Sequence, residues 1–293
     1  MSGAPLAVTA PARYVTLAYG EGDAVYAQAS MLLLSLLAHA PEPRELVVVT
    51  DHPERLEWLR DAVRIESISG ALLERWRGPA PFSMRQKIHV AAAMMPASGT
   101  LVCLDADVMA MRDLQSFIDE VGAGARFMHT REYELGSSRR RGNRRLWQAL
   151  EGQTFGSWRF RADDGMWNSG VVAVPATDEG LIQEALALYD AMAGAGIRHF
   201  ATEQLVVGLV LERSGRLREA REWFTHYWGN KSIFTEEIQG RLRSARELGL
   251  TPEAAAAELR GNPIRLPAEA RPGKWDKLKR WLNRGQPTFR VVT

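Results

Sequence analysis

The sequence predicts an α/β fold, with a mostly parallel central sheet flanked by helices and a helical extension at the C-terminus. Short apolar runs typical of buried strands alternate with helix-length segments through residues 12–115. Several of these runs end in tyrosine, glycine or aspartate, as expected where the carboxyl ends of parallel strands form a ligand site. A charged, helix-like tail after about Ile238 predicts the extension.

The first half alternates strands and helices. Gly20, Gly22 and Asp23 break the first strand, and Pro96 and Gly99 stop the last helix before the aspartate-bearing strand. The predicted strands are 13–19 (RYVTLAY), 45–51 (ELVVVTD), 64–69 (RIESIS) and 101–104 (LVCL). The predicted helices are 24–37, 53–63 and 82–95. This order is typical of a parallel sheet covered by helices.

The second half is less regular. Strands are predicted over 126–130 (RFMHT) and 169–175 (SGVVAVP). Amphipathic helices are predicted over 178–196 and 202–215, the second capped by Thr202. A long arginine-rich loop is expected between the two strands, and no internal repeat or low-complexity tract is present.

Composition restricts the class of protein. The chain has 293 residues, 46% hydrophobic and 25% charged, enough for one large or two small domains. The net charge of +2 argues against a polyanion binder, so no nucleic-acid partner is expected. Cys103 is the only cysteine, which excludes an intrachain disulfide. We see no signal peptide, and the apolar run 29–40 is too short to span a bilayer, so a buried helix and a cytoplasmic protein are expected.

The apolar strand 101–104 runs directly into Asp105, Ala106 and Asp107. Two carboxylates this close together repel each other and resist desolvation, so they are expected to have a partner. A hard divalent cation such as Mg²⁺ or Mn²⁺ takes oxygen ligands and would serve. A turn that only caps the next element is the alternative.

Three later stretches also carry polar residues typical of sites. Each has an ordinary structural explanation: a turn, the capping of a helix N-terminus, and a surface histidine. In this order, after a strand-helix half, they fit a single account together with the aspartate turn. The stretches are Asn168-Ser169-Gly170, Glu203-Gln204, and the segment HYWGNK with His226, Gly229 and Lys231.

Together these residues resemble the nucleotide-sugar transferases of the GT-A fold. They most closely resemble glycosyltransferase family 8, the group of glycogenin and the bacterial lipopolysaccharide galactosyl- and glucosyltransferases. The resemblance covers roughly residues 12–235. It implies a Rossmann-like sheet, Mn²⁺ (or Mg²⁺), and retaining transfer of a hexose from a UDP-sugar to a glycan, lipid-linked or other hydroxyl acceptor. Retention implies that the departing phosphate oxygen takes the acceptor proton.

The resemblance also implies domains. Residues 1–240 would form the GT-A domain, with a nucleotide-binding half over 12–115 and an acceptor and sugar half over 116–240. Residues 241–293 would form the helical, basic C-terminal extension.

The resemblance assigns roles to individual residues. The implied metal ligands are Asp105, Asp107 and His226. The implied catalytic residues are Gln204, Glu203 and Asn168. The implied nucleotide-sugar contacts are Ala18, Tyr19, Asp23, Arg85, Lys87, Asp105, Ala106, Asn168, Ser169, Gly170, Gly229 and Lys231. Asp51, at the end of the second strand, is either a base or ribose contact or a turn residue.

The chain departs from the family pattern at three places. Lys231 follows its glycine by two residues instead of three, and Ser232-Ile233 replaces the family's Pro-Trp. Glu203 replaces an aspartate, and the arginine-rich loop is long. The altered lysine spacing motivates an alternative, a degenerate GT-A domain that binds a sugar nucleotide without turnover.

Other enzyme classes fit less of the sequence. The segment VCLDADV matches the first motif of a haloacid-dehalogenase-type phosphatase, and Asp163-Asp164-Gly165 imitates a later acidic motif. That first motif normally opens the fold, whereas here three strand-like segments precede it. An inverting transferase would need Glu203, Asp163 or Asp164 as its base. No G-x-G-x-x-G follows the first strand, which argues against a dinucleotide-binding oxidoreductase.

Two basic segments remain. The cluster within 139–145 is a solvated loop, a lid over donor phosphates, or a contact for an anionic acceptor. In residues 271–293, Trp275, Leu278, Trp281 and Leu282 share one helical face, with basic residues mostly on the others. This pattern is typical of a helix lying peripherally on the inner face of an anionic membrane, and packing onto the protein body is the alternative.

Overall fold

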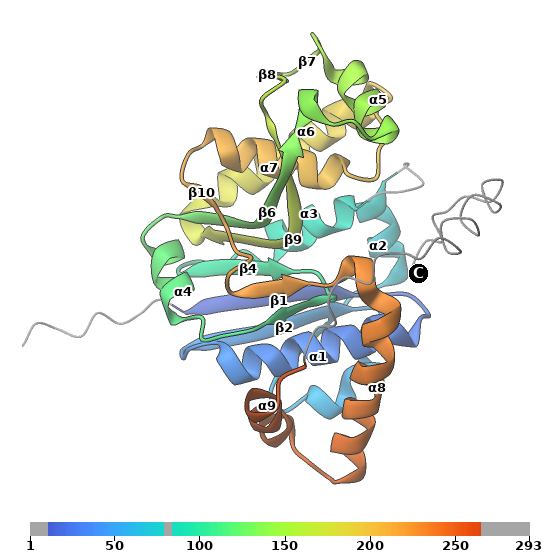
Figure 1. Ribbon diagram of the computed structural model, residues 1–293, viewed down its shortest axis with the longest axis vertical. Coiled ribbons are helices and arrows are strands. Elements are labelled where there is room, and N and C mark those ends of the chain that lie inside the picture. Colours follow the sequence, from blue (N-terminus) through green and yellow to red (C-terminus); the bar gives the residue numbers. More distant parts are fainter. Residues whose placement is uncertain (1–10, 79–83, 265–293) are drawn as a thin grey trace, which may run out of the picture.

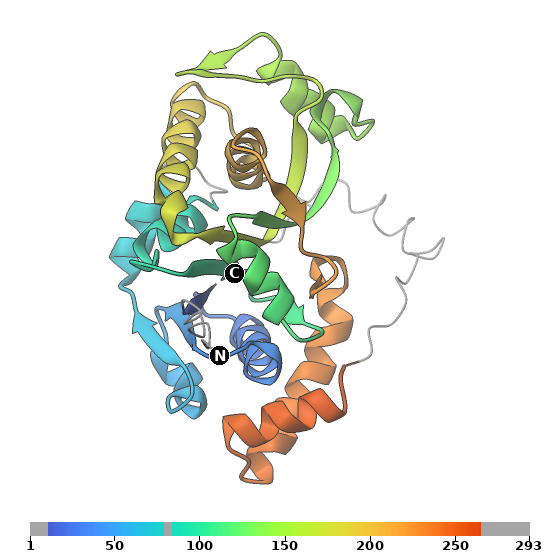
Figure 2. The same cartoon turned by 90° about the vertical axis from the view of Figure 1, so that its left-hand side faces the viewer.

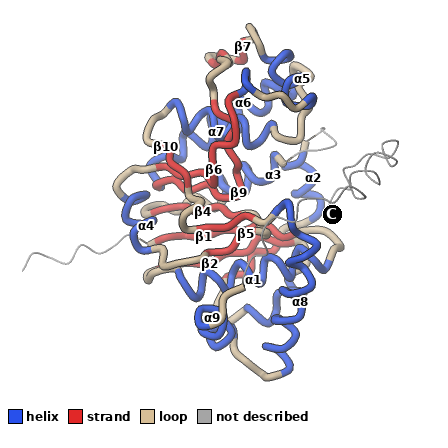
Figure 3. The backbone as a smooth tube through the Cα atoms, in the orientation of Figure 1, coloured by secondary structure: helices blue, strands red, loops and turns tan. Residues whose placement is uncertain are grey.

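The structure is a computed structural model that describes residues 11–78 and 84–264. At its centre lies a seven-stranded sheet with the strand order β10-β6-β9-β4-β1-β2-β3 (Figures 1 and 3). In that order the strands are Leu217–Glu219, Arg126–Glu134, Gly165–Pro175, Thr100–Leu104, Ala12–Ala18, Arg44–Thr50 and Arg64–Ser67.

The sheet is mostly parallel. β1 pairs in parallel with β2 and β4, β2 with β3, and β6 with β10. Among the strands of this sheet, β9 alone runs antiparallel, between β4 and β6. The α/β fold class with a mostly parallel, helix-flanked sheet is therefore confirmed.

Helices cover both faces of the sheet and create two hydrophobic cores (Figure 2). One core joins the sheet to α1, α4, α8 and α9, which are Asp23–His39, Gln115–Gly122, Lys231–Glu247 and Pro252–Gly261. The other core joins it to α2, α3, α5, α6 and α7, which are Gly70–Arg77, Arg85–Ala93, Arg141–Leu150, Glu179–Gly194 and Thr202–Arg213.

Burial explains the two most apolar elements. All eleven residues of β9 are buried, because helices cover this central strand on both faces. Along α1 the apolar run 29–40 is buried between the sheet and α8 and α9, as predicted. Across the ranges that the structure describes, no helix is both long and apolar enough to cross a bilayer.

Several predicted elements need correction. Residues 53–63 hold a short 3₁₀ helix, η1 (Pro53–Leu59), in place of an α-helix. α2 was not predicted, and α5 occupies part of the expected arginine-rich loop. Thr202 is the first helical residue of α7 and not its cap, since its Oγ1 donates a hydrogen bond to the His199 carbonyl.

The predicted C-terminal extension begins as the second half of α8 and α9, which pack on α1. The helix predicted within 271–293 lies outside the described residues, so its membrane contact stays a prediction.

Two small antiparallel pairs complete the fold. β5 (Val108–Ala110) pairs with β11 (Phe224–His226), and Val108 lies opposite His226. β7 (Thr154–Phe155) and β8 (Trp158–Arg159) form a separate hairpin. The pair of β5 and β11 places His226 beside the aspartate turn, because Val108 directly follows Asp107.

Candidate functional site

The aspartate turn is held by backbone hydrogen bonds at the carboxyl end of β4. The Asp105 amide donates to the Gly170 carbonyl of β9 at 2.9 Å, and the Val108 amide donates to the Asp105 carbonyl at 3.1 Å. Ala106, with its small side chain, is buried between the two aspartates. The turn therefore presents both carboxylates beyond the end of β4, as the sequence predicts for a ligand site.

His226 joins the two aspartates. Its Nε2 lies 3.3 Å from Asp107 Oδ1 and 3.8 Å from Asp105 Oδ2. One candidate ligand atom from each of the three residues lies within 4.8 Å of the other two. The structure thus brings together the three residues implied as metal ligands, and we call them the metal-ligating cluster.

The residues around this cluster fit a divalent cation. His226 Nδ1 lies 2.9 Å from Asn168 Oδ1, which also accepts from the Gly170 amide at 2.9 Å. Because this oxygen already accepts from the Gly170 amide, Nδ1 is the nitrogen that donates to it, and this contact directs Nε2 toward the two aspartates. Asp107 Oδ2 is buried and lies 3.0 Å from the Lys231 ammonium nitrogen. Two carboxylates and one imidazole form a donor set that suits Mn²⁺ or Mg²⁺.

Lys231, the first residue of α8, lies on the far side of Asp107. Its Nζ is 3.0 Å from Asp107 Oδ2, so the shortened spacing after Gly229 still brings the ammonium group to the cluster. Burial opposes ionisation of Asp107, but His226 and Lys231 outweigh it and lower the pKa of this carboxyl. Asp107 is therefore the ionised ligand expected at neutral pH.

Gly170 has a steric role. A Cβ at this position would lie 2.3 to 2.8 Å from three atoms of the His226 ring. A side chain here would push the imidazole away from the aspartates. The glycine of the Asn-Ser-Gly stretch thus allows the histidine to reach the metal-ligating cluster.

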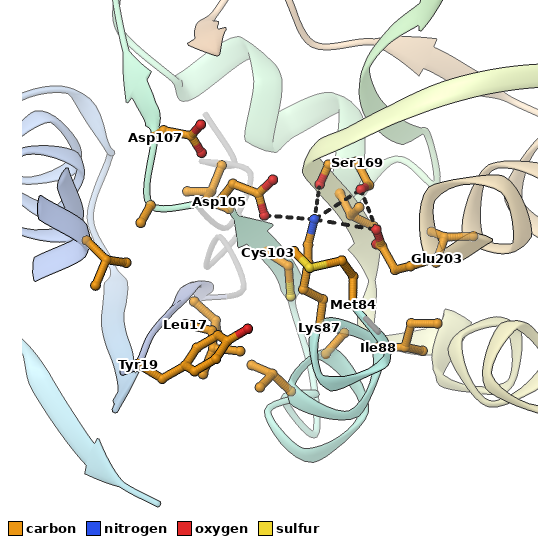
Figure 4. A pocket seen from close by; sticks show the side chains of 18 of the residues that line it. Leu17, Tyr19, Met84, Lys87, Ile88, Cys103, Asp105, Asp107, Ser169 and Glu203 are labelled. Atoms are coloured by element: carbon orange, nitrogen blue, oxygen red, sulfur yellow. Dashed lines mark hydrogen bonds and ion pairs between the residues drawn. The ribbon is translucent and has the colours of Figure 1, made fainter. Parts of the chain in front are cut away.

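A second polar group, which we call the lysine network, lies beside the cluster and shares Asp105 with it (Figure 4). Lys87 Nζ lies 2.7 Å from Asp105 Oδ1 and 3.6 Å from Glu203 Oε2, and it donates to Ser169 Oγ at 3.0 Å. Ser169 Oγ in turn donates to Glu203 Oε2 at 2.8 Å. The network comprises Lys87, Asp105, Ser169 and Glu203.

The pKa values of Lys87 and Glu203 are both raised, for different reasons. Burial disfavours the ammonium form of Lys87, but the carboxylates of Asp105 and Glu203 outweigh it and raise the pKa of the lysine. Burial raises the pKa of Glu203 above its usual value, although Lys87 opposes the shift. Lys87 is therefore held as a cation.

A cavity of about 170 Å³ opens beside both groups (Figure 4). Tyr19, at the end of β1, lines it together with Lys87, Asp105 and Asp107. Much of its remaining wall is apolar and comes from β1, α3, β4, β9 and α7. These apolar residues include Leu17, Ile88, Cys103, Val172 and Val207. Charged groups at one side and apolar surface at the other suit a ligand with an anionic and a less polar part.

Sequence reasoning missed Glu132, which connects two of the implied catalytic residues. Its Oε1 accepts from Asn168 Nδ2 at 3.2 Å, and its Oε2 accepts from Gln204 Nε2 at 3.4 Å. The prediction ended this strand at residue 130, whereas β6 continues to Glu134. The β-branched and aromatic residues Thr130 and Tyr133 were the signal for the longer strand.

Other implied donor contacts lie apart from the two groups. Arg85 pairs with both oxygens of Asp190 on α6, at 2.6 and 2.8 Å. Asp23 is exposed and pairs with Arg55 at 2.6 Å. Ala18 is fully buried, which leaves only its backbone for a ligand.

The remaining polar residues of the β1 and β2 ends serve the local fold. Asp51 accepts from the Gly20 amide at 3.1 Å and from the Tyr26 hydroxyl at 3.2 Å. This favours the turn role over a base contact. Gly229 lies in η4 (Trp228–Asn230), two residues before Lys231 in sequence.

The phosphatase alternative is not supported by the positions of its acidic residues. Asp164 is buried against Arg213 at 2.8 Å, and Asp163 is exposed nearby. Asp163 and Asp164 directly precede the first residue of β9, whereas Asp105 hydrogen-bonds to Gly170, in the middle of β9. At about 3.3 Å per residue, the stretch of β9 before Gly170 holds Asp163 and Asp164 too far from Asp105 for one metal ion to bind them together. The same separation removes Asp163 and Asp164 as bases for an inverting reaction at this site.

No family model matches the chain, and no curated protein matches it. Among solved structures, the apo form of mouse xyloside xylosyltransferase 1 is similar over 71% of this chain and 84% of that chain. The sequence identity is 15% and the TM-score is 0.46. A similarity this remote leaves the function to be inferred from the site itself.

Proposed function

We propose that this protein is a metal-dependent glycosyltransferase of the GT-A type that uses a UDP-sugar as donor. The observation that carries the proposal is the metal-ligating cluster beside the cavity, with Lys231 against Asp107 and Tyr19 on the cavity wall. The motifs that resemble glycosyltransferase family 8 support the same reading, because several of them meet at this one place.

The proposed donor lies with its diphosphate at the metal-ligating cluster and its uracil against Tyr19. Asp105, Asp107 and His226 would hold a Mn²⁺ or Mg²⁺ ion, which would stabilise the negative charge that develops on the leaving diphosphate. Lys231 would add a compact positive charge near the same phosphates. Asn168 fixes the His226 ring through Nδ1, so this residue acts on the metal site as a positioning residue.

The proposed transfer is retaining and moves a hexose to a hydroxyl acceptor. Glu203 is poorly placed to be a general base, since Ser169 and Lys87 already occupy its Oε2. The departing phosphate oxygen can take the acceptor proton instead. Gln204 would orient the acceptor or stabilise the sugar cation, and Glu132 holds its amide in place.

Calorimetric titration of UDP, with and without Mn²⁺ and with GDP as the control, tests this proposal. Tight UDP binding that requires Mn²⁺ is expected, with GDP binding more weakly. UDP release from a panel of UDP-sugars, with water or added acceptors, then tests turnover. Metal-dependent binding with no release from any donor would favour the degenerate domain. Failure to bind UDP under both conditions would contradict the donor assignment.

Peripheral membrane contact through residues 271–293 is a separate prediction. Full-length protein should sediment with anionic liposomes more strongly than a chain ending at residue 270, while both hydrolyse the donor. Equal sedimentation of the two chains would argue against it.

A further inference from the structure

Five arginines gather on α5 and the residue pair before it, above the end of β6 (Figure 1). All five are exposed, and in the ranges that the structure describes none has a carboxylate within ion-pair distance. We call them the arginine patch: Arg139, Arg140, Arg141, Arg144 and Arg145.

The patch differs from the other arginines near it. Arg131 of β6 and Arg213 of α7 each pair with a glutamate or aspartate, at 3.3 and 2.8 Å. A surface that leaves five guanidinium groups unpaired maintains a strong local positive potential. On its other side α5 packs Leu146 and Leu150 into the core, so the helix holds these charges on a fixed support.

The patch connects to the candidate site by two routes. Tyr133, the neighbour of Glu132, feels the charge of Arg140. Burial raises the pKa of Tyr133 to about 12, and the positive charge of Arg140 opposes this rise. Gly142 lies against His199, where an added Cβ would be 3.9 Å from Nε2. His199 accepts a hydrogen bond from Thr202, the residue before Glu203 and Gln204.

The patch lies on the β6 side of the site, away from Tyr19. Tyr19 directly follows β1, whereas α5 follows β6, and β9 and β4 separate these two strands in the sheet. The donor diphosphate already has the metal-ligating cluster and Lys231. The anion that meets the patch therefore belongs to a different molecule, one that approaches past Glu132 and Gln204.

We propose that the arginine patch binds phosphate groups of a phosphorylated saccharide acceptor. This inference rests on the proposed glycosyltransferase function and names its acceptor class. Arginine forks bind phosphate oxygens in a bidentate manner, and a cluster of arginines without lysine favours such planar recognition. The apolar face of α5 is buried, so the helix itself offers a membrane only charge.

Binding of a fluorescent phosphorylated dextran, followed by anisotropy in EDTA, tests the proposal. EDTA removes the divalent cation that would bridge phosphate to the metal-ligating cluster. The patch variant Arg140→Gln/Arg141→Gln/Arg144→Gln is compared with the matched variant Arg60→Gln/Arg112→Gln/Arg243→Gln. Both sets are exposed and change the net charge equally. Unphosphorylated dextran and vesicles of phosphatidylglycerol serve as alternative ligands.

The patch variant should bind phosphorylated dextran about tenfold or more weakly than wild type, and the matched variant less than about threefold more weakly. Equal weakening in both variants, no binding by wild type, or equal binding of unphosphorylated dextran would overturn the proposal. Patch-dependent binding of vesicles without binding of phosphorylated dextran would replace it with a membrane surface.

UDP release from the donor in water, measured on the same samples, separates the proposed glycosyltransferase function from the proposed phosphate binding by the arginine patch. The patch variant should keep the wild-type rate of donor hydrolysis. Absence of hydrolysis in wild type would count against the proposed function, while dextran binding would still report on the patch.

Discussion

The metal-ligating cluster and the lysine network share Asp105 but differ in how their charges are balanced. In the network, Lys87 contacts Asp105, Glu203 and Ser169, so one ammonium group lies between two carboxyl groups. In the cluster, Lys231 contacts Asp107 from outside, and one candidate ligand atom from each of Asp105, Asp107 and His226 lies within 4.8 Å of the other two. The difference teaches that the network holds its own cation, Lys87, between its carboxyl groups, whereas the three cluster residues converge on one position that a metal cation can take.

Asp107→Asn should break the cluster with the largest effect. Loss of one ionised ligand should weaken Mn²⁺-dependent UDP binding about 100-fold or more and nearly abolish transfer. His226→Ala should do the same. Calorimetry of UDP with Mn²⁺ measures this, with the exposed Asp163→Asn as control. Wild-type affinity in Asp107→Asn would refute the metal assignment.

Lys87→Met should break the network in a different way. It leaves Glu203 and Asp105 without their buried cation, which should lower the free energy of unfolding by about 3–5 kcal/mol. Adding Glu203→Gln should recover part of this loss, because one unpaired charge disappears. Urea unfolding of the single and double variants measures both effects. A double variant no more stable than Lys87→Met would show that charge pairing is not the cause.

Gly170→Ala should disturb the cluster indirectly. The added methyl group would overlap the His226 ring, so Mn²⁺ affinity should fall by about 10- to 100-fold. The matched control is Gly180→Ala on α6, where a Cβ meets nothing within 4 Å. Metal titration of both proteins gives the answer, and equal affinities would contradict the steric role of Gly170.

Asp190→Ala should have the smallest effect. It tests the difference between two basic residues of α3, Arg85 and Lys87. Arg85 lies two residues before Lys87, but it pairs with the half-exposed Asp190 away from the network. Loss of this surface pair should cost less than about 1 kcal/mol and leave UDP affinity unchanged. A clear drop in UDP affinity would instead bring Arg85 back as a donor contact.

The parallel strands could be predicted from the sequence because buried strands need continuous apolar runs, as in 45–51 and 101–104. α5 was missed because its arginines read as a loop, although Leu146 and Leu150 recur at helical spacing. Sequence alone could not show that Arg85 and Lys87 contact different partners, because the rotation of α3 about its axis decides which side chain faces the network.

Within the candidate site, motif order was enough to assemble the metal-ligating cluster, which meets through the pairing of β5 and β11. Glu132 was not predictable in the same way. It forms no motif, and its contacts with Asn168 and Gln204 depend on the register between β6 and β9 and on the position of α7. Such contacts arise from tertiary packing and leave no local pattern.

The end of β6 and the start of β9 lie side by side in the sheet. Glu134 at the end of β6 lies opposite Gly165 at the start of β9, so residues 135–164 leave and rejoin the sheet at the same point. A segment with adjacent ends can be lengthened or exchanged at little cost to the frame that holds it. Under the proposed function, homologues should therefore vary most in residues 135–164. They would gain new acceptors by replacement of this one segment, while the residues proposed to hold the donor stay unchanged.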